Sequence, residues 1–439
     1  MLLDERARWF GFWLLDKKNG GNIRRAYDEI RYAYRNGTSM EETEEKIAKV
    51  IEHARRTTAF YKDIPEGAKL CDLPIVNKDT YRADYDAFLS SEYLGEKGSR
   101  VMTTSGSTGT PLRIVQNRTK VQYDTADGIF FGAMADYYIG MKMGFIRVWV
   151  QNVRKSALRL MAENMIMVDS SDLGEESIAK MLEMFRRKRV KCLIGYASAL
   201  SEISRYIERH KYDTKKLSII SIIPISEGMP AVVRDKLREQ FGCPVQQWYS
   251  NEENGIMGIQ GRNSSSYYID SENFYLEILK LDSDEPAEEG ELGRIVITDL
   301  RNMAMPIIRY DNGDLAVAEK VWKDGRFKLY LREVYGRRSD TIFDTQGHAL
   351  TPFVITNNLW DVEGVLQYRF IQETVDTYTL ELNGDRDAID EADVLRRIQP
   401  YFGEDAQIRI VYVDEIPVLN SGKRKYIENR CDVYAERLR

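Results

Sequence analysis

The sequence predicts an α/β protein: a large N-terminal domain with mixed sheets flanked by helices and a β-rich subdomain, and a small α+β C-terminal domain. From about residue 100 to 260, short β-branched runs alternate with helical stretches, as in strand-helix units around parallel strands. From about 267 to 335, strands follow one another closely, with acidic or glycine-containing turns between them. After Gly336, short strands and helices mix over a length that suffices for a separate domain. We therefore expect one domain at 1–338 and a second at 339–439.

Roughly the first 60 residues alternate apolar and charged positions at helical spacing, which predicts a helical entry segment. The apolar and aromatic run at 9–15 is too short to span a bilayer, and it follows Asp4 and Glu5 rather than a basic region. We therefore expect no signal peptide and no transmembrane segment. Two interpretations of the run stay open: contact with a membrane surface, or packing of an amphipathic first helix on the core.

The composition of the 439 residues is that of a globular protein, with 43% hydrophobic and 30% charged residues. The net charge of -6 comes without long runs of one sign, which argues against a nucleic-acid partner. The four cysteines show no C-x-x-C spacing, so we expect neither a zinc site nor a disulfide framework, and a reducing cytoplasm fits best. The three histidines stand in unrelated contexts and predict no Ser-His-Asp arrangement. The expected partners are small molecules or other proteins.

The strongest chemical signal is the run TTSGSTGTP at 103–111, followed by the strand-like residues 112–115. Hydroxyl side chains and unobstructed backbone N–H groups can surround phosphate oxygens. The run is not a Walker A motif, because no Gly-Lys-Ser/Thr follows and it leads into a strand. The alternative is a surface turn rich in Ser, Thr and Gly. The candidate phosphate-binding residues are Thr104, Ser105, Gly106, Ser107, Thr108, Gly109 and Thr110.

This run resembles the signature loop of the adenylate-forming superfamily, which includes acyl-CoA synthetases, adenylation domains and luciferases. Leu112 stands where many members have lysine, a pattern similar to the phenylacetate-CoA ligase branch and its CapK-like relatives of capsular-polysaccharide biosynthesis. FYKDIP near residue 60, LPIVNKDTYRADYDAFLS at 73–90 and IGYASAL at 194–200 also look like that branch. The resemblance covers most of the chain. It implies an AMP-binding adenylation domain at 1–338 and a mobile domain at 339–439.

Two further segments are candidates for the nucleotide site. Ser226 and Glu227 follow a buried strand, where α/β sheets usually bind ligands, and the resemblance assigns them to the adenine pocket. The alternative is a strand-to-helix turn capped by Ser226. In WYSNEENG at 248–255, an aromatic ring and a carboxylate can stack on a purine and hold magnesium.

The WYSNEENG segment is similar to the superfamily motif Y-G-x-[ST]-E. The similarity assigns Tyr249, Ser250 and Asn251 to the adenine and ribose site and Glu253 to the magnesium ion. Glu252 replaces the usual small hydroxyl residue, which puts one contact with the α-phosphate in doubt. A solvated acidic turn is the alternative.

Three more candidates come from motifs in the second half of the chain. RYDNGD at 309–314 is similar to Y-R-T-G-D, which assigns Asp314 to the ribose hydroxyls; a carboxylate can accept two hydrogen bonds from a vicinal diol. GRRSD at 336–340 resembles G-R-x-x-D, with Arg337 reaching phosphate or ribose oxygens and Asp340 at the hinge. The alternatives are an N-G-D turn between strands and an exposed basic turn.

Near the C-terminus, PVLNSGK at 417–423 is similar to the P-x-x-x-S-G-K loop of the superfamily. Adenylation displaces pyrophosphate, so negative charge develops on phosphate oxygens, and a mobile ammonium group there stabilises the transition state. We assign this catalytic role to Lys423, with Lys425 as the second candidate. A basic surface loop is the alternative.

The favoured hypothesis is an ATP- and Mg²⁺-dependent ligase that converts a small-molecule carboxylate into its acyl-adenylate and passes the acyl group to an acceptor. The resemblance implies coenzyme A as acceptor, or an amine if the protein serves surface-polysaccharide biosynthesis. Glu252 and the absent lysine at 112 motivate a different hypothesis, a non-catalytic nucleotide-binding scaffold. A third hypothesis is adenylylation of a cofactor carboxylate as the final product. Four retained residues argue against the scaffold: Glu253, Asp314, Arg337 and Lys423.

Overall fold

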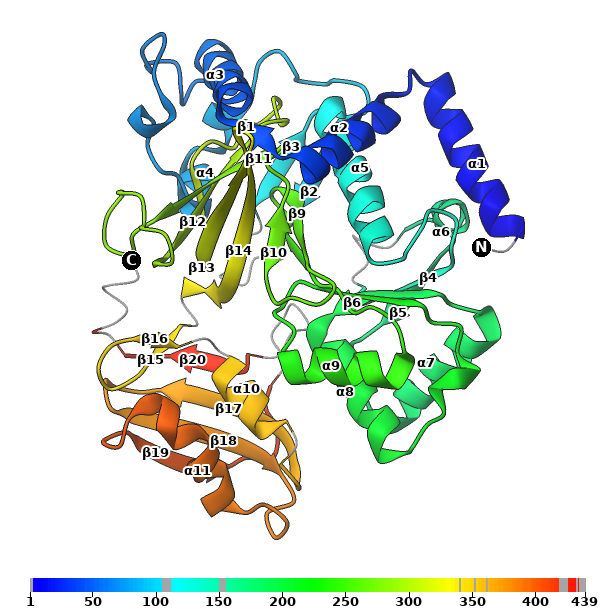
Figure 1. Ribbon diagram of the computed structural model, residues 1–439, viewed down its shortest axis with the longest axis vertical. Helices are drawn as coiled ribbons and strands as arrows, with labels where there is room; N and C mark the ends of the chain where they lie inside the picture. The colour runs from blue at the N-terminus through cyan, green and yellow to red at the C-terminus, as the bar shows by residue number, and fades with distance from the viewer. Residues whose placement is uncertain are drawn as a thin grey trace.

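The computed structural model describes residues 3–104, 112–149, 155–338, 341–350, 353–360, 362–417, 425–431 and 433. Parallel and antiparallel sheets combine with helices, which confirms the mixed α/β class expected from the sequence. Figure 1 shows the large antiparallel sheet below the N-terminal helices, the parallel sheet with its own helices beside it, and the C-terminal sheet beneath the antiparallel one.

Helices form the start of the described chain. They and one short strand are α1 (Leu3–Lys18), α2 (Asn22–Asn36), β1 (Thr38–Ser39) and α3 (Met40–Thr57). α2 begins where the Asp16 carboxylate accepts hydrogen bonds from the backbone N–H groups of Ile23 (3.1 Å) and Arg24 (3.0 Å). α3 begins with a capping box, in which Ser39 Oγ accepts from the Glu42 backbone N–H at 3.1 Å. These caps explain why the periodic pattern breaks into separate helices.

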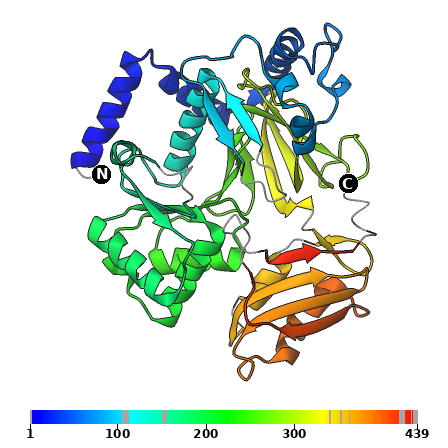
Figure 2. The same cartoon turned by 180° about the vertical axis from the view of Figure 1, so that it is seen from behind.

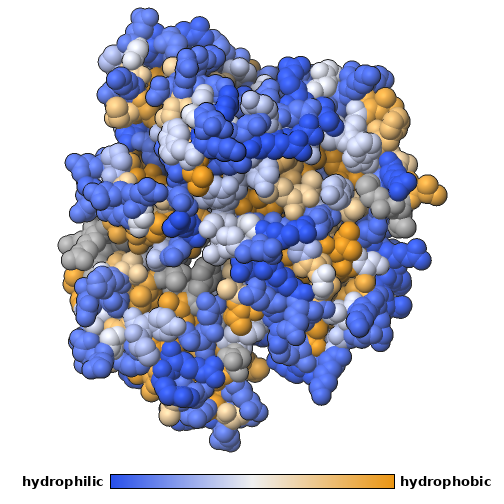
Figure 3. Space-filling view, in the orientation of Figure 1, coloured by the Kyte–Doolittle hydropathy of each residue, from blue (hydrophilic) through white to orange (hydrophobic). Residues whose placement is uncertain are grey.

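One face of α1 is anchored and another is exposed. The buried Glu5 carboxylate pairs with Lys191 Nζ at 2.8 Å, which fixes the helix against the rest of the chain. The opposite face presents Leu3, Phe10 and Leu14, which are 86%, 62% and 55% exposed. Apolar residues also gather near this edge of the molecule in the space-filling view (Figure 3). Within the described part of the chain, no helix has the length and hydrophobicity needed to cross a membrane.

The segment after α3 leads to a two-stranded hairpin and a long helix. Its elements are η1 (Leu70–Asp72), α4 (Lys78–Ala83), η2 (Tyr85–Phe88), β2 (Arg100–Thr103), β3 (Arg113–Gln116) and α5 (Arg118–Met134). β2 and β3 pair antiparallel with Thr103 opposite Arg113, and the hairpin is seen from behind in Figure 2. The predicted phosphate-binding run therefore connects two paired strands.

A four-stranded parallel sheet follows, with strand order β5-β4-β6-β7. Its elements are β4 (Met143–Arg147), α6 (Ala157–Glu163), β5 (Met165–Asp169), α7 (Glu175–Lys188), β6 (Cys192–Tyr196), α8 (Ala197–Arg209), η4 (Thr214–Lys216), β7 (Ser221–Ile225) and α9 (Ala231–Phe241). Apolar residues of α7, α8 and α9 form one buried cluster with the sheet. The carboxyl ends of β4, β6 and β7 carry Arg147, Tyr196 and Ile225, at the edge where parallel sheets usually bind ligands.

The large sheet is antiparallel, and its main order is β11-β12-β13-β14-β10-β9-β8, with β1 paired to β14. Its strands are β8 (Trp248–Asn251), β9 (Gly255–Gln260), β10 (Tyr267–Ile269), β11 (Phe274–Leu279), β12 (Leu292–Asp299), β13 (Tyr310–Lys323) and β14 (Arg326–Arg337). β13 and β14 pair from Lys323 opposite Arg326 to Asp314 opposite Arg337. This pairing brings two of the predicted site residues together at the end of the hairpin.

The C-terminal part has its own sheet and its own buried cluster. Its elements are β15 (Ile342–Phe343), β16 (Ala349–Leu350), α10 (Phe353–Leu359), β17 (Val365–Gln372), β18 (Thr377–Gly384), α11 (Glu391–Phe402), β19 (Gln407–Tyr412) and β20 (Ile427–Asn429). The four main strands lie in the order β19-β18-β17-β20. Phe370, Tyr378 and Phe402 are buried in this cluster, so the mixture of strands and helices expected after Gly336 forms a compact α+β unit.

Candidate active site

Asp314 and Arg337 face each other at the end of the β13–β14 hairpin. They are cross-strand partners, and Arg337 Nε lies 3.3 Å from Asp314 Oδ1. The Asp314 side chain is 17% exposed, whereas the Arg337 side chain is 55% exposed. Gly313 and Gly336 both have a positive φ next to this pair, at the open end of the hairpin and away from its turn at 324–325. A fixed carboxylate therefore lies next to a guanidinium group that reaches solvent.

Asp314 is held by two further side chains. Tyr249 donates its hydroxyl hydrogen to Asp314 Oδ2 at 2.9 Å, and Asn312 Nδ2 donates to the same oxygen at 2.9 Å. Burial raises the pKa of Asp314, while the Arg337 charge and the hydrogen bond from Tyr249 oppose that rise. Glu253 is close enough for its charge to raise the same pKa. The carboxylate is therefore fixed in orientation and lies in a low-dielectric surrounding.

The Tyr249 ring was expected at the face of the adenine base. It is buried in an apolar cluster with Met257, Tyr267 and Ile269, and its centroid lies 6.3 Å from that of Tyr267. Its hydroxyl receives a hydrogen bond from Asn312 Nδ2 at 2.9 Å in addition to binding Asp314. In this arrangement Tyr249 links the core to the acidic end of the hairpin.

Glu253 lies in the turn between β8 and β9 and is buried. Tyr310 donates its hydroxyl hydrogen to Glu253 Oε1 at 3.0 Å, and Lys78 Nζ lies 3.0 Å from the same oxygen. Lys78 comes from α4, and sequence reasoning did not identify it, although it belongs to the segment at 73–90 that resembled the ligase branch. These contacts join Lys78, Glu253 and Tyr310 into one polar cluster. The cluster also includes Asp314, on which the charge of Glu253 acts.

A single carboxylate at this place is compatible with magnesium. Among the described residues, no group of three or more His, Cys, Asp and Glu side chains could hold a metal ion. Mg²⁺ usually binds one or two protein carboxylates and takes its other ligands from water and substrate phosphates. The oriented, buried carboxylate of Glu253 matches that requirement.

The turn that carries Glu253 rests on a buried lysine that sequence reasoning missed. Lys120 of α5 donates to the backbone oxygen of Asn254 at 2.7 Å. Its Nζ also lies 2.8 Å from Asp299 Oδ2 and 3.0 Å from Asp124 Oδ1. Burial lowers the pKa of Lys120, but the two carboxylates outweigh this effect and raise it above the ordinary value. Lys120 therefore stays charged and holds the turn.

Thr104 is the part of the predicted phosphate-binding run that the structure describes. Its backbone N–H donates to the Leu112 backbone oxygen at 2.9 Å, and its hydroxyl accepts from the Leu112 N–H at 3.0 Å. Thr104 is buried and closes the base of the loop. The remaining predicted residues of the run lie outside the described residues: Ser105, Gly106, Ser107, Thr108, Gly109 and Thr110. Asp340 and Lys423 also lie outside them.

Ser226 and Glu227 lie in the turn after β7, as the sequence predicted. Ser226 has a φ of 69°, and the Glu227 carboxylate accepts a hydrogen bond from the Ser198 backbone N–H at 2.9 Å, at the start of α8. α9 begins after Pro230 and has no side-chain cap, so Ser226 does not cap it. Glu227 Oε1 is buried and has no hydrogen-bond partner among the described residues.

Ser250 and Asn251 belong to the β8–β9 hairpin. Ser250 pairs with Ile256, and Asn251 Oδ1 accepts from the Asn254 backbone N–H at 2.7 Å. Asn251 therefore orders the turn that holds Glu253. Its Nδ2 is buried without a partner in the described part of the chain, which leaves the two N–H donors of this amide group for a ligand.

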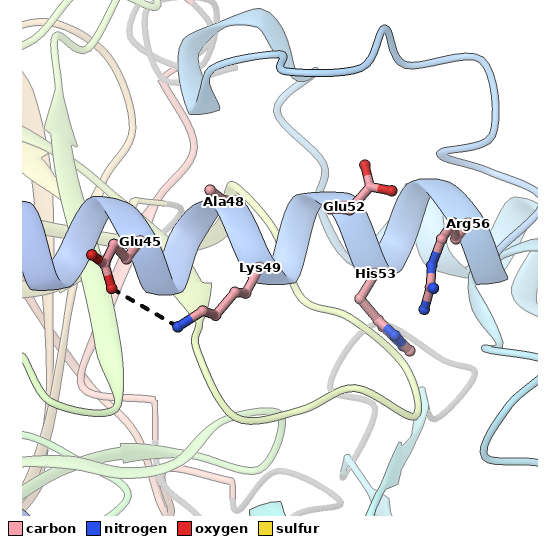
Figure 4. A pocket seen from close by; sticks show the side chains of 6 residues that line it. All are labelled: Glu45, Ala48, Lys49, Glu52, His53 and Arg56. Atoms are coloured by element: carbon pink, nitrogen blue, oxygen red, sulfur yellow. Dashed lines mark ion pairs between the residues drawn. The ribbon is translucent and has the colours of Figure 1, made fainter.

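A surface hollow on α3 is separate from these residues. It is lined by Glu45, Ala48, Lys49, Glu52, His53 and Arg56 (Figure 4). All six side chains come from one helix, and an ion pair of 3.9 Å joins Glu45 and Lys49. None of the predicted nucleotide-binding residues lines this hollow.

Comparisons with known proteins agree with this fold. A family model of the CapK C-terminal domain matches residues 342–430. Protein CapK of Staphylococcus aureus is 21% identical over 426 residues, which cover 92% of this chain and 92% of the relative. A phenylacetate-coenzyme A ligase of Thermus thermophilus is 25% identical over 393 residues, covering 83% of this chain and 82% of the relative.

Solved structures of CoA ligases share the fold. A 2-hydroxyisobutyryl-CoA ligase in the postadenylation state, in complex with R3-HIB-AMP, has a TM-score of 0.69 at 15% identity and covers 90% of each chain. The same ligase with 2-HIB-AMP and CoA in the thioesterification state has a TM-score of 0.58 at 16% identity, also covering 90% of each chain. An anthranilate CoA ligase in complex with anthranoyl-AMP has a TM-score of 0.54 at 13% identity, covering 74% of this chain and 64% of that chain.

These findings place the chain in the adenylate-forming ANL superfamily, and its fold is that of acyl-CoA ligases. Its distant homologues include CoA ligases whose structures hold acyl-adenylates. Within the superfamily, the chain is a CapK / phenylacetate-CoA ligase-like protein.

Proposed function

We propose that this chain is an AMP-forming acid ligase, which activates a carboxylic acid with ATP and then transfers the acyl group to coenzyme A. The observation that carries the proposal is the polar cluster around the end of the β13–β14 hairpin. Asp314, Arg337 and Glu253 come from separate strands and turns, yet they interact electrostatically. This combination of a diol acceptor, a phosphate-binding cation and a metal carboxylate suits Mg·ATP.

The hydrogen-bonding capacity of Asp314 supports a ribose-binding role. A carboxylate offers about four lone-pair sites. Tyr249 and Asn312 bind Oδ2, and Arg337 lies beside Oδ1. One acceptor site therefore remains for a ribose hydroxyl, and a second becomes free when the exposed Arg337 turns toward phosphate.

Glu253 is the residue that we assign to magnesium, which neutralises triphosphate charge when it is bound. Tyr310 and Lys78 fix the same carboxylate oxygen, Oε1. The orientation of this carboxylate is thus set before any ligand arrives, so little ordering is required on binding. Lys78 offers a second positive charge next to the phosphates.

The substrate carboxylate acts as the nucleophile, so no protein nucleophile is required. Its attack on the α-phosphate forms acyl-AMP and releases pyrophosphate. We assign the stabilisation of this charge to the loop at 104–110 and to Lys423.

Coenzyme A is the acceptor that the relatives favour, since one binds CoA together with an acyl-adenylate and another is named a phenylacetate-coenzyme A ligase. An amine acceptor in surface-polysaccharide biosynthesis is the competing proposal, motivated by the similarity to Protein CapK. Incubating the enzymatically formed acyl-AMP with CoA or with amino sugars separates them. A thioester product supports the first proposal, and an amide product supports the second.

ATP–pyrophosphate exchange with a panel of carboxylic acids tests the first half-reaction. The panel contains aryl, fatty, hydroxy and amino acids. We expect exchange with one class of acid and its loss in Lys423→Ala. Lys180→Ala is the matched control, because Lys180 forms an exposed ion pair with Glu176 on α7. ATP binding without exchange for any acid would favour the nucleotide-binding scaffold instead.

A further inference from the structure

A second polar group lies at the carboxyl end of the parallel sheet, outside the nucleotide cluster. Arg147 is the last residue of β4, a strand that lies between β5 and β6. Its Nε atom is buried and has no hydrogen-bond acceptor among the described residues. Its guanidinium carbon lies 5.6 Å from the centroid of the Trp149 ring. Arg147 is therefore a partly buried cation with unused hydrogen-bonding capacity.

The neighbours of Arg147 are held in place. Trp149 is 6% exposed, and its Nε1 donates to the backbone oxygen of Val168 at 3.1 Å. The hydroxyl of Tyr196, at the end of β6, is hydrogen-bonded to Arg147. Burial raises the pKa of Tyr196, and the positive charge of Arg147 acts in the opposite direction. Two aromatic side chains thus fix the position of the guanidinium group.

Arg147 has carboxylates nearby but no ion pair with any of the described ones. Glu227 and Glu252 both act electrostatically on Tyr196, which places them near this end of the sheet. The Nε atom of Arg147 is buried and has no hydrogen-bond acceptor among the described residues. A partly buried charge without a counterion is unfavourable, and a guanidinium group matches a carboxylate with two parallel hydrogen bonds. A carboxylate of a bound ligand can supply the anion that pairs with the guanidinium group of Arg147.

The location separates Arg147 from the nucleotide. The charges that act on Asp314 come from Arg337 and Glu253, whereas those that act on Tyr196 come from Arg147, Glu227 and Glu252. Glu252 and Glu253 are adjacent in one turn, so this turn contributes one carboxylate to each polar group. The ribose and phosphates are assigned to Asp314 and Arg337, and the adenine pocket to Ser226 and Glu227. Arg147 belongs to neither set, so its guanidinium group is available to the acid.

We propose that Arg147 binds a second anionic group of the acid substrate, so that this ligase activates dicarboxylic acids at one of their two carboxyl groups. This inference rests on the proposed acid-activating function. One carboxylate attacks the α-phosphate, and the other pairs with Arg147 over the Trp149 ring. An acid with only one carboxylate leaves the guanidinium group without its partner.

Matched acids of equal chain length test this assignment in the exchange assay. Butyrate is compared with succinate, and hexanoate with adipate, for wild type, Arg147→Met and Arg147→Lys. Methionine keeps most of the side-chain length but removes charge and donors, whereas lysine keeps the charge without the bidentate geometry. The control is Arg186→Met, since Arg186 forms an exposed ion pair with Glu183.

We expect wild type to prefer one of the two diacids over its monoacid. Arg147→Met should lose about 10- to 100-fold in kcat/KM for that diacid, the range expected for hydrogen bonds to a charged group. Its KM for Mg·ATP and its activity with the monoacid should stay close to wild type. A wild-type preference for the monoacids, or an equal loss with every acid and with ATP, would overturn the assignment.

Binding of the same diacids without ATP keeps this inference separate from the proposed function. Calorimetric titration of wild type and Arg147→Met with succinate and adipate needs no turnover. Diacid binding that is lost in Arg147→Met, without exchange for any acid, would refute acid activation and retain the anion site. Equal binding to both proteins, or binding to neither, would refute the anion site itself. Circular dichroism spectra of the variants confirm that they are folded.

Discussion

Replacing Lys120 with methionine removes a cation that is 1% exposed and lies beneath the turn of Glu253. Asp124 keeps a partner, because Arg100 also binds it, and Asp299 keeps backbone hydrogen bonds at Oδ1. Breaking a buried ion pair by removing one partner costs about 3–5 kcal/mol. Since both carboxylates retain some partners, we expect a loss near the lower limit, about 3 kcal/mol of the free energy of unfolding.

Urea unfolding followed by tryptophan fluorescence measures this loss. The control is Lys180→Met, which removes an exposed pair with Glu176 and should change stability by less than about 0.5 kcal/mol. The double variant Lys120→Met/Asp299→Asn should recover part of the loss, because it removes one of the uncompensated buried charges. If Lys120→Met were as stable as the control, the inference that Lys120 holds the turn of Glu253 would be refuted.

Three other side chains give independent predictions. Asp314→Ala should weaken ATP binding about 10- to 100-fold in calorimetric titration, because charge-assisted hydrogen bonds to ribose are lost; unchanged affinity would contradict the ribose assignment. Burial raises the pKa values of Asp127 and of Asp270, the latter to about 6, so the stability contributed by protonated Asp270 is present at low pH and is lost as pH rises through 6. Asp270→Asn should therefore flatten the decrease of Tm between about pH 4 and 6, and an unchanged slope would contradict this. Arg205, whose guanidinium carbon lies 4.3 Å from the Trp360 ring, joins α8 to the C-terminal unit; Arg205→Ala should speed proteolysis near residue 340, and equal rates would exclude this contact as a restraint.

The sequence predicted strand-helix alternation at about 100–260 and closely spaced strands at 267–335, but it did not fix the boundaries of the elements. The run at 217–223 is one of the apolar runs at which a strand was expected, yet β7 begins at Ser221 because pairing with β6 starts with Ser221 opposite Cys192. The short helix η4 ends at Lys216, before this run, and begins with Asp213 accepting from the Lys215 N–H at 3.2 Å. Ile219 is buried without being in a strand, so hydrophobicity alone could not locate the boundary.

The long-range partners of the site were beyond sequence reasoning. Lys120 lies in a helix whose pattern gives no reason to bury a lysine, and lysines are rarely buried without a partner. Its partner Asp299 is the last residue of β12 in the large antiparallel sheet. The two residues are far apart in the sequence, so only the tertiary fold brings them together. The ion pair between Lys78 and Glu253 also joins two residues that are far apart in the sequence. By contrast, Asp314 and Arg337 each followed from a local motif, and strand pairing makes them neighbours.

Tyr249 illustrates a motif that locates a residue without its contacts. The sequence placed Tyr249 in the nucleotide site, and its hydroxyl does bind Asp314. Its ring, however, packs in the apolar cluster with Met257, which lies on β9, the strand paired with β8. Adenine stacking by this ring remains a prediction.

The most direct test of the central claim is acid-dependent ATP–pyrophosphate exchange by wild type and by Asp314→Ala and Lys423→Ala. The proposed function predicts exchange with at least one carboxylic acid and its loss in both variants, with ATP binding weakened in Asp314→Ala. Exchange that persists in both variants, or its absence in wild type with every acid while ATP binds, would contradict the proposal.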